Sequence, residues 1–163
     1  MKYTLITGAS GFIGANLIKL FLSKKIKILV KNNKFHHEKA KTVNVDISNK
    51  NINFNFLKDV ETIIHLASIS EKNSKKNKKK VKQANYNFVK DLFEQSKKYN
   101  VRRIIKISTA KVYGLNLNKR VTEKSKLRPF SDYAYYHAKS DKFLYKNIDK
   151  GKLDIIILRI SNG

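Results

Sequence analysis

Three glycines at a spacing of three, Gly8, Gly11 and Gly14 in the segment TGASGFIG, could bind a phosphate group. They follow a short apolar run and precede an amphipathic stretch, so they stand at a turn from a strand into a helix. Glycine allows a sharp turn, lets backbone N–H groups approach a pyrophosphate, and lets the helix pack closely on the sheet. A plain strand-to-helix turn is the alternative, because the spacing GxxGxxG alone is a weak motif.

Tyr135 and Lys139 could transfer a proton. They are four residues apart in a predicted helix, so both side chains lie on one face. A phenol with a pKa of about 10 is a poor base at neutral pH, but a neighbouring ammonium favours its phenolate. Chance also produces such pairs in a chain with eight tyrosines and 31 lysines. Tyr133 and Tyr136 are interpreted as packing residues, and His137 as an ordinary helix residue.

Strands and helices must position these residues, and the strands can be predicted from apolar runs in the sequence. The runs are short, β-branched and nearly continuous, as in strands buried on both faces. The runs cover residues 3–7, 26–30, 42–45, 60–66, 101–108 and 153–158. Helical patterns lie between several of them, at about 12–21, 85–98 and 133–148. This alternation predicts one α/β domain over residues 1–163, a doubly wound parallel sheet of about six strands. The connection 31–41 is short, so it is a single helical turn or irregular.

The segment EKNSKKNKKKVK (71–82) is dense in lysine and has no apolar periodicity. This pattern predicts a mobile surface loop. A phosphate-binding loop is the alternative, which the absence of arginine disfavours.

The charge balance is strongly basic, with 36 Lys+Arg against 12 Asp+Glu and a net charge of +24. Lysine outnumbers arginine 31 to 5, and 17 residues are asparagine. Lys, Asn and Ile share A/T-rich codons, so a biased genome explains the composition. Arginine, which recognises bases and phosphates with two hydrogen bonds, is scarce. We therefore do not expect nucleic-acid binding as the main function, although the charge keeps it as an alternative.

Other composition features narrow the class of protein. The chain has no cysteine and four scattered histidines, so we expect no metal site. No segment reaches the ~18 to 20 apolar residues that cross a bilayer. The first apolar run leads into a glycine turn instead of a cleavage site, which argues against a signal peptide. We expect a cytoplasmic protein without a membrane partner.

Several motifs in collinear order resemble the extended short-chain dehydrogenase/reductase family, the NAD(P)-dependent epimerases and dehydratases of nucleotide sugars. The segments that carry the resemblance are TGASGFIGANL (7–17), VNVDIS (43–48), VETIIHLAS (60–68), NYNFVKDLFEQSKKYNVRRIIKISTAKVYG (85–114), YAYYHAKSDK (133–142) and LDIIILRISNG (153–163). The resemblance implies a Rossmann-like fold, NAD or NADP as cofactor, and a nucleotide-sugar substrate. It also implies a homodimer in which helices 85–98 and 133–148 pack against their mates.

The resemblance assigns site residues position by position. It implies that Tyr135 exchanges a proton with the substrate hydroxyl, that Lys139 holds the nicotinamide ribose, and that Thr109 orients the same hydroxyl. Asn162 would approach the substrate. The cofactor-binding residues that it implies are Gly8, Gly11, Phe12, Ile13, Gly14, Asn32, Asp46, Ile47, Leu66, Ala67, Asn85, Tyr135 and Lys139.

Two departures bear on chemistry and cofactor. Ala110 and Lys111 stand where sugar dehydratases of this family carry an Asp-Glu pair that eliminates water. This favours an epimerase or a keto-sugar reductase. Asn32 stands where an acid normally selects NAD, with Lys31 and Lys34 nearby, so NADP stays open.

A third departure concerns length, because the sequence ends where the family continues into a C-terminal substrate domain. We therefore expect the N-terminal, cofactor-binding part of such an enzyme, with that domain missing. The alternative is a non-catalytic or vestigial dinucleotide-binding fragment.

Overall fold

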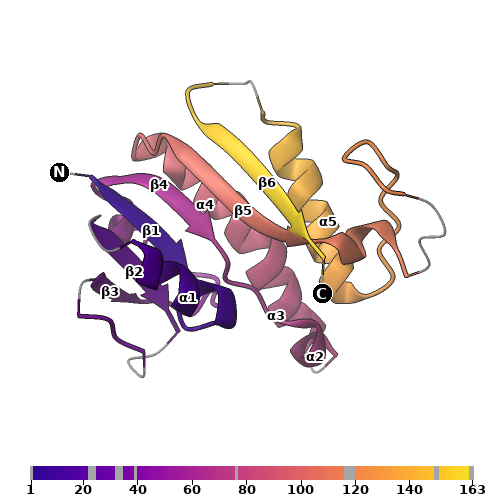
Figure 1. The fold of residues 1–163 in the computed structure, drawn as a ribbon, viewed down its shortest axis with the longest axis horizontal. Helices are drawn as coiled ribbons and strands as arrows, with labels where there is room; N and C mark the ends of the chain where they lie inside the picture. Colours follow the sequence, from indigo (N-terminus) through magenta and orange to yellow (C-terminus); the bar gives the residue numbers. More distant parts are fainter. Residues whose placement is uncertain are drawn as a thin grey trace.

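The computed structural model describes residues 2–21, 25–31, 35–38, 40–75, 77–115, 120–148 and 151–161. These residues contain a six-stranded sheet in the order β3-β2-β1-β4-β5-β6, in which all neighbouring strands are parallel (Figure 1). The strands are β1 (Tyr3–Thr7), β2 (Ile26–Val30), β3 (Ala40–Asn44), β4 (Val60–His65), β5 (Arg103–Thr109) and β6 (Asp154–Ile160). The predicted doubly wound α/β fold is confirmed. The order reverses between β1 and β4, and ligands of such sheets bind at this switch point.

Helices cover the sheet on both faces. In Figure 1, α1 (Phe12–Leu20) lies in front of the sheet, and α4 (Phe88–Lys98) and α5 (Asp132–Tyr145) lie behind it. Neighbouring residues of β1 face opposite sides, as the two-residue period of a strand requires. Leu5 belongs to the apolar core with Leu92 and Leu144, and Ile6 belongs to the core with Ile18. The Leu5 and Ile6 side chains are therefore buried on opposite faces of β1, which explains why two consecutive residues of this strand are apolar.

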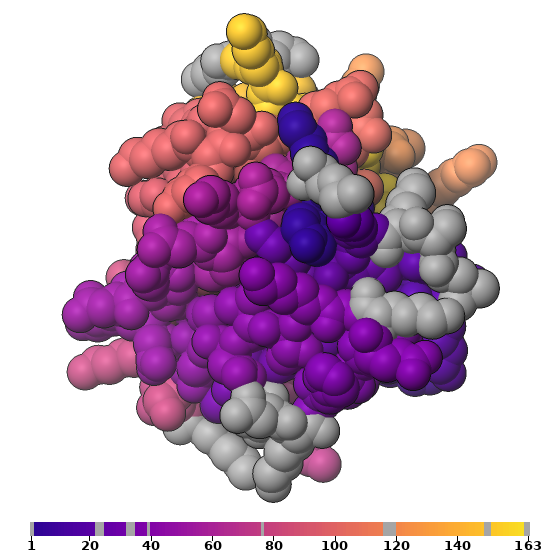
Figure 2. Space-filling view, turned by 90° about the vertical axis from the view of Figure 1, so that its left-hand side faces the viewer, coloured from indigo at the N-terminus to yellow at the C-terminus, as the bar shows by residue number. Residues whose placement is uncertain are grey.

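The connections around β3 are irregular. Among the described residues between β2 and β3, 31 and 35–38, none is helical, in agreement with the short spacing. The segment from β3 to β4 contains one 3₁₀ turn, η1 (Asn55–Leu57), and occupies the middle of the face seen in Figure 2. Phe56 and Leu57 are buried in the core, so this segment covers the side of the sheet near β3.

The lysine-dense segment lies at the surface, as predicted, but it is helical, so the prediction that it is a loop is wrong. Its described residues form α2 (Glu71–Ser74) and α3 (Lys78–Lys82), and α3 continues through a π-helical turn, η2 (Gln83–Asn87), into α4. The Asn77 side chain caps α3 by accepting the Lys80 N–H at 3.0 Å. Val81 is fully buried. The anchoring residue and the cap both help to order the segment, and neither produces an apolar period in the sequence.

Candidate functional site

The glycine turn joins β1 to α1 at the switch point. Gly8 has φ +69°, and a Cβ on it would lie 2.7 Å from the Ala67 backbone nitrogen. A Cβ on Gly14 would overlap the Gly8 carbonyl oxygen and lie 2.7 Å from Ala9 Cα. Among the described atoms, a Cβ on Gly11 would meet only the Gly8 carbonyl oxygen, at 3.2 Å. Gly8 therefore makes the turn, Gly14 lets the helix pack on it, and Gly11 leaves open space in front of it.

The first turn of α1 presents free N–H groups. Gly11 is the N-cap of α1, no side chain caps the helix there, and no acidic residue lies in its first turn. The first N–H groups of a helix have no partner within it, and the helix dipole adds partial positive charge at this end. The turn can therefore bind an anion such as a pyrophosphate.

Thr7 and His65 fix the ends of β1 and β4 against each other. The Thr7 hydroxyl oxygen lies 2.8 Å from His65 Nδ1 and accepts the Ala67 N–H at 3.1 Å. The hydroxyl proton is thus available to Nδ1. Burial, with a smaller effect of the Lys106 charge, lowers the pKa of His65 to about 3, so the ring is neutral. This junction holds the backbone after β4 against Gly8.

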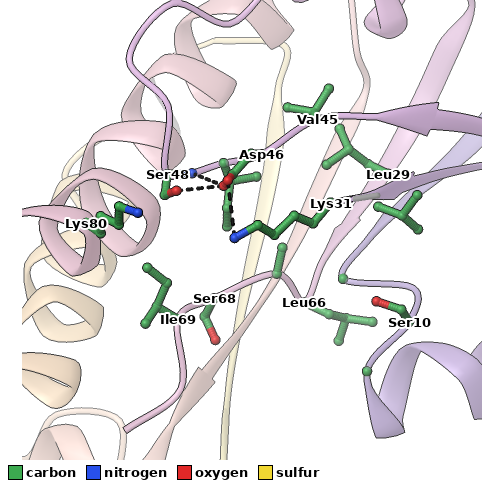
Figure 3. Close-up of a pocket in the computed structure, with 15 residues that line it drawn as sticks. Ser10, Leu29, Lys31, Val45, Asp46, Ser48, Leu66, Ser68, Ile69 and Lys80 are labelled. Carbon is green, nitrogen blue, oxygen red and sulfur yellow. Dashed lines mark hydrogen bonds and ion pairs between the residues drawn. The ribbon is translucent and has the colours of Figure 1, made fainter. Parts of the chain in front are cut away.

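A first cavity of about 410 Å³ lies beside the glycine turn, between the ends of β2, β3 and β4. Figure 3 shows Asp46 at its wall with Lys31 reaching toward it. Asp46 Oδ1 accepts hydrogen bonds from the Ser48 N–H at 2.9 Å and the Ser48 hydroxyl at 2.7 Å, and Oδ2 lies 3.3 Å from Lys31 Nζ. Burial would raise the pKa of Asp46, but the bonds from Ser48 and Lys31 outweigh it and lower the pKa. Asn32 lies outside the described residues.

A second cavity of about 250 Å³ lies on the other side of the same turn. Both cavities are lined by Gly8, Gly11, Leu66 and Ser68, so they adjoin. The wall of the second cavity away from the turn comes from β5 and α5. The residues that supply it are Ser108, Thr109, Tyr133 and His137.

Tyr135 and Lys139 do not line the second cavity, so the structure does not bring them together with Thr109 there. The Tyr135 side chain is 48% exposed, and its ring centroid lies 5.2 Å from that of Tyr136. Lys139 Nζ lies 4.7 Å from the centre of the Tyr86 ring. Each residue of a helix is rotated by about 100° from the one before it, so positions two apart differ by about 200°. Tyr135 and Lys139 therefore face away from Tyr133 and His137.

Tyr133 and His137 occupy the face that points to β5. Their ring centroids are 4.5 Å apart in an edge-to-face arrangement. Burial raises the pKa of the Tyr133 phenol, although the Lys111 charge and a hydrogen bond with Thr109 oppose this. Tyr133 is therefore a phenol at neutral pH and can donate a proton. The signal that could have found it is Ser131, whose hydroxyl accepts the Ala134 N–H at 3.2 Å and so fixes where the helix begins.

A buried charge cluster lies behind this wall. Asp141 Oδ1 accepts from Lys106 Nζ at 2.7 Å, and its Oδ2 accepts from the Ser108 hydroxyl and from Arg159 Nε, each at 2.9 Å. Asp141 is fully buried, and Lys106 is 1% exposed. Burial would raise the pKa of Asp141, but Lys106, Arg159 and Ser108 together hold it below its ordinary value. Two cations thus share one carboxylate.

The remaining predicted residues fall into three groups. Ile47, Leu66 and Ala67 line the first cavity, and Phe12 and Ile13 line the second. Asn85 lines neither cavity in the described structure. Its side chain accepts from the Ile69 N–H at 2.8 Å and donates to the Ile69 carbonyl at 3.0 Å, so it holds the loop after β4. Asn162 lies outside the described residues.

Two ion pairs join the segment 71–82 to elements that border the second cavity. Glu71 pairs with Lys111, the second residue of the 3₁₀ turn η3 (Ala110–Tyr113). Lys78 Nζ lies 3.1 Å from Asp132 Oδ1 at the start of α5. α2 and α3 are therefore fixed to the elements that carry Thr109 and Tyr133.

Two searches of the described residues gave negative results. No group of three or more His, Cys, Asp or Glu side chains there could hold a metal ion. None of the helices formed by those residues has the length and apolar character of a membrane span.

The strand order, the glycine turn at the switch point and the two adjoining cavities define a dinucleotide-binding domain of the Rossmann type. The chain belongs to the NAD dependent epimerase/dehydratase family, whose model matches residues 4–163.

The chain is similar to several named proteins. It is 29% identical to the dTDP-D-glucose 4,6-dehydratase of Dictyostelium discoideum, over 97% of this chain and 43% of that protein. Among solved structures it is similar to UDP-N-acetylglucosamine 4-epimerase from Methanobrevibacter ruminantium, with 26% identity and a TM-score of 0.85 over 97% of this chain and 54% of the other. The fold is also that of dTDP-glucose 4,6-dehydratase from Streptomyces venezuelae, solved with NAD, with 24% identity and a TM-score of 0.85 over 96% and 55%. The chain spans about half the length of the curated relatives it matches.

Proposed function

We propose that this chain is the cofactor-binding part of an NAD(P)-dependent epimerase or keto-reductase that acts on nucleotide sugars. One observation carries the proposal: the two cavities adjoin at a helix N-terminus with free N–H groups and no Cβ at Gly8 or Gly11. A dinucleotide has two nucleoside halves joined by a pyrophosphate, and this arrangement offers one place for each part.

The residues present fit the cofactor. The N–H groups of the first turn of α1 would hold the pyrophosphate. The first cavity, with Asp46 and Ile47, would hold the adenosine half, and the second cavity would hold the nicotinamide half. When bound, the nicotinamide supplies hydride transfer to or from the sugar carbon.

Tyr133 and Thr109 supply the proton chemistry of the proposed reaction. The Tyr133 phenol holds a proton that it can donate to a sugar keto oxygen, and the Thr109 hydroxyl can hold that oxygen in place. Tyr133 thus takes the role that Tyr135 had in the sequence-based prediction. Ala110 and Lys111 follow Thr109 and provide no acid–base pair for water elimination, so dehydration is disfavoured.

The choice between NAD and NADP depends on charges in the first cavity. Both oxygens of Asp46 already accept bonds, from Ser48 and from Lys31. Lys80 also lines this cavity. Lys31 and Lys80 can tolerate the 2′-phosphate of NADP, because the Asp46 carboxylate already accepts other bonds. We therefore expect both NAD and NADP to bind.

The relatives support the substrate class, because the named proteins act on UDP- or dTDP-sugars. They are about twice as long as this chain, so turnover requires the part that those proteins have in addition. The alternative is a dinucleotide-binding fragment without catalysis. A cytoplasmic location and a homodimer through α4 and α5 stay predictions, the second to be tested by sedimentation.

Cofactor binding tests the proposal directly. The purified protein mixed with NADH or NADPH should enhance the nicotinamide fluorescence and raise the melting temperature. No response to either dinucleotide would refute the proposal. Turnover of UDP-glucose or dTDP-glucose that disappears in Tyr133→Phe would refute the non-catalytic alternative.

A further inference from the structure

His137 is a buried histidine between the second cavity and the Asp141 cluster. The residue is 4% exposed and lines the cavity. Its Nδ1 lies 3.4 Å from Lys106 Nζ. Its Nε2 is buried and has no hydrogen-bond partner within the described residues. Buried polar atoms without a partner are rare in native proteins, so this nitrogen needs an explanation.

Lys106 determines which nitrogen of His137 carries the proton. An ammonium group donates hydrogen bonds and cannot accept them. Burial lowers the pKa of Lys106, but the Asp141 carboxylate, which accepts from its Nζ at 2.7 Å, opposes this. As an ammonium group, Lys106 requires a lone pair on His137 Nδ1, and the proton of a neutral ring would then be on Nε2. The unpartnered atom is thus an N–H donor.

The surroundings keep the His137 ring neutral. Burial and the Lys106 charge lower its pKa well below 6.5, and Asp141 only partly opposes them. The other titratable groups that face this region are His65 from β4, Tyr133 one turn earlier in α5, and Arg159 from β6 through Asp141. None of them is an acid free to protonate the ring, because the one carboxylate already accepts from Lys106, Ser108 and Arg159.

We propose that Lys106 locks His137 in the Nε2–H tautomer and that this N–H donates a hydrogen bond to the half of the dinucleotide that enters the second cavity. The inference rests on the proposed function for the identity of the ligand. The acceptor would be an oxygen of that half, a ribose hydroxyl or a carboxamide carbonyl. Lys106 is a positioning residue, because it is 1% exposed and acts on the ligand only through the imidazole.

Ligands of graded length test the donor. We would measure the dissociation constants of NADH, ADP-ribose and ADP for the wild type, His137→Leu and His137→Gln. Loss of one hydrogen bond weakens binding by about tenfold, so His137→Leu should lose this factor for NADH and not for ADP. A glutamine amide can place an N–H near Nε2, so His137→Gln should recover most of the affinity. ADP-ribose contains the second ribose but no nicotinamide. If His137→Leu also weakens the binding of ADP-ribose, the acceptor is a ribose hydroxyl; if it weakens only the binding of NADH, the acceptor is the carboxamide carbonyl.

The possible results separate this inference from the proposed function. If the wild type binds none of the three ligands, the proposed function fails and the donor role of His137 fails with it. If the wild type binds NADH and His137→Leu binds it equally well, only the inference about His137 is overturned. Equal weakening of NADH and ADP in His137→Leu would also overturn it, since this indicates general damage to the fold.

The tautomer lock can be tested without any ligand. In ¹⁵N NMR spectra of the histidine rings, the wild type should show His137 as the Nε2–H tautomer at pH 7, and His137→Gln assigns the signal by its disappearance. An Nδ1–H tautomer in the wild type would overturn the inference whether or not any variant folds. Lys106→Met should release the lock and give a mixture of tautomers.

Lys27→Met is the matched control. Lys27 is also a buried strand lysine, 5% exposed, and its Nζ donates to the backbone carbonyls of Phe56 and Lys58. It lines neither cavity in the described structure. Its loss should also lower stability while leaving the His137 signal unchanged. A shifted tautomer in both variants would indicate a structural effect and contradict the proposed role of Lys106.

Discussion

A Cβ atom on Gly8 would lie 2.7 Å from the backbone nitrogen of Ala67, although 59 residues separate the two in the chain. Gly8 also has φ +69°, a region that costs other residues roughly 1–2 kcal/mol. Gly8→Ala adds overlap with backbone that cannot rotate away. We expect a loss of about 2–4 kcal/mol in the free energy of unfolding, measured by urea denaturation.

Gly151→Ala is the control for this change. A Cβ at Gly151 would meet no atom of the described residues within 4 Å. Its free energy of unfolding should stay within about 0.5 kcal/mol of the wild type. If both variants lost equal stability, the close approach of Gly8 to β4 would not be what requires glycine there.

Gly11→Ala should separate binding from stability. Of the atoms that the structure describes, the new Cβ meets only the Gly8 carbonyl oxygen, at 3.2 Å, and otherwise projects into the space in front of α1. We expect less than about 1 kcal/mol of lost stability. The NADH dissociation constant should rise at least about tenfold, because the pyrophosphate can no longer approach the N–H groups closely. Unchanged NADH affinity, measured by nicotinamide fluorescence, would place the pyrophosphate elsewhere.

Tyr133→Phe and Tyr135→Phe form a pair that tests the assignment of the proton donor. Tyr133 lines the second cavity beside Thr109, whereas Tyr135 is half exposed on another face of α5. With the remaining part of the enzyme present, Tyr133→Phe should lower sugar turnover by about 10²–10⁴-fold. Tyr135→Phe should leave it within about twofold. The reverse result would restore the pair that the sequence first indicated.

The fold could be predicted because local features define it. Every residue of Ile26–Val30 is buried, and a strand buried on both faces is mostly apolar. Lys27 is the exception, and its Nζ donates to the carbonyls of Phe56 and Lys58. The turn at Gly8 and the helix packing at Gly14 could be predicted because both are local requirements, whereas the close approach of Gly8 to Ala67 joins residues 59 apart in the chain. The position of Thr109 at the carboxyl end of a strand could be predicted because the apolar run 101–108 leads directly to it, and it is the last residue of β5.

The face of α5 could not be predicted from spacing. Tyr133, Tyr135 and Tyr136 lie within one turn of the helix, and both Tyr133–His137 and Tyr135–Lys139 have the i,i+4 spacing. Only packing against β5 decides between them. Lys106 could not be recognised either, because its partner Asp141 is 35 residues away in the sequence.

Stability should fall in acid because two histidines are buried in the neutral form. Burial lowers the pKa of His65 to about 3, and it lowers that of His137 as well. Below the unfolded value of about 6.5 the unfolded chain binds protons that the folded chain does not, so stability falls as the pH falls from 6.5 toward 3. Each ring contributes at most about 1.4 kcal/mol per pH unit. Urea denaturation at pH 7.5, 6.0 and 5.0 measures the slope.

The pH test has an internal control in His36, which is exposed and is the histidine near Thr42. His36→Gln should leave the slope between pH 7.5 and 5.0 unchanged. His65→Gln should reduce the slope, although it lowers stability at pH 7.5 by removing the bond to Thr7. A slope that is the same in all three proteins would mean that acid acts through other groups.

Asp141→Asn should be among the most damaging single substitutions, because it leaves Lys106 and Arg159 near each other without the carboxylate between them. Removing one partner from a buried ion pair typically costs about 3–5 kcal/mol. Asp154→Asn is the matched comparison, since Asp154 pairs with Arg103 at 2.6 Å but the two side chains are 46% and 41% exposed. An exposed pair contributes at most about 1 kcal/mol. If the two variants lost similar stability in urea, Lys106 would be neutral in the folded protein, and the tautomer lock on His137 would lose its charged donor.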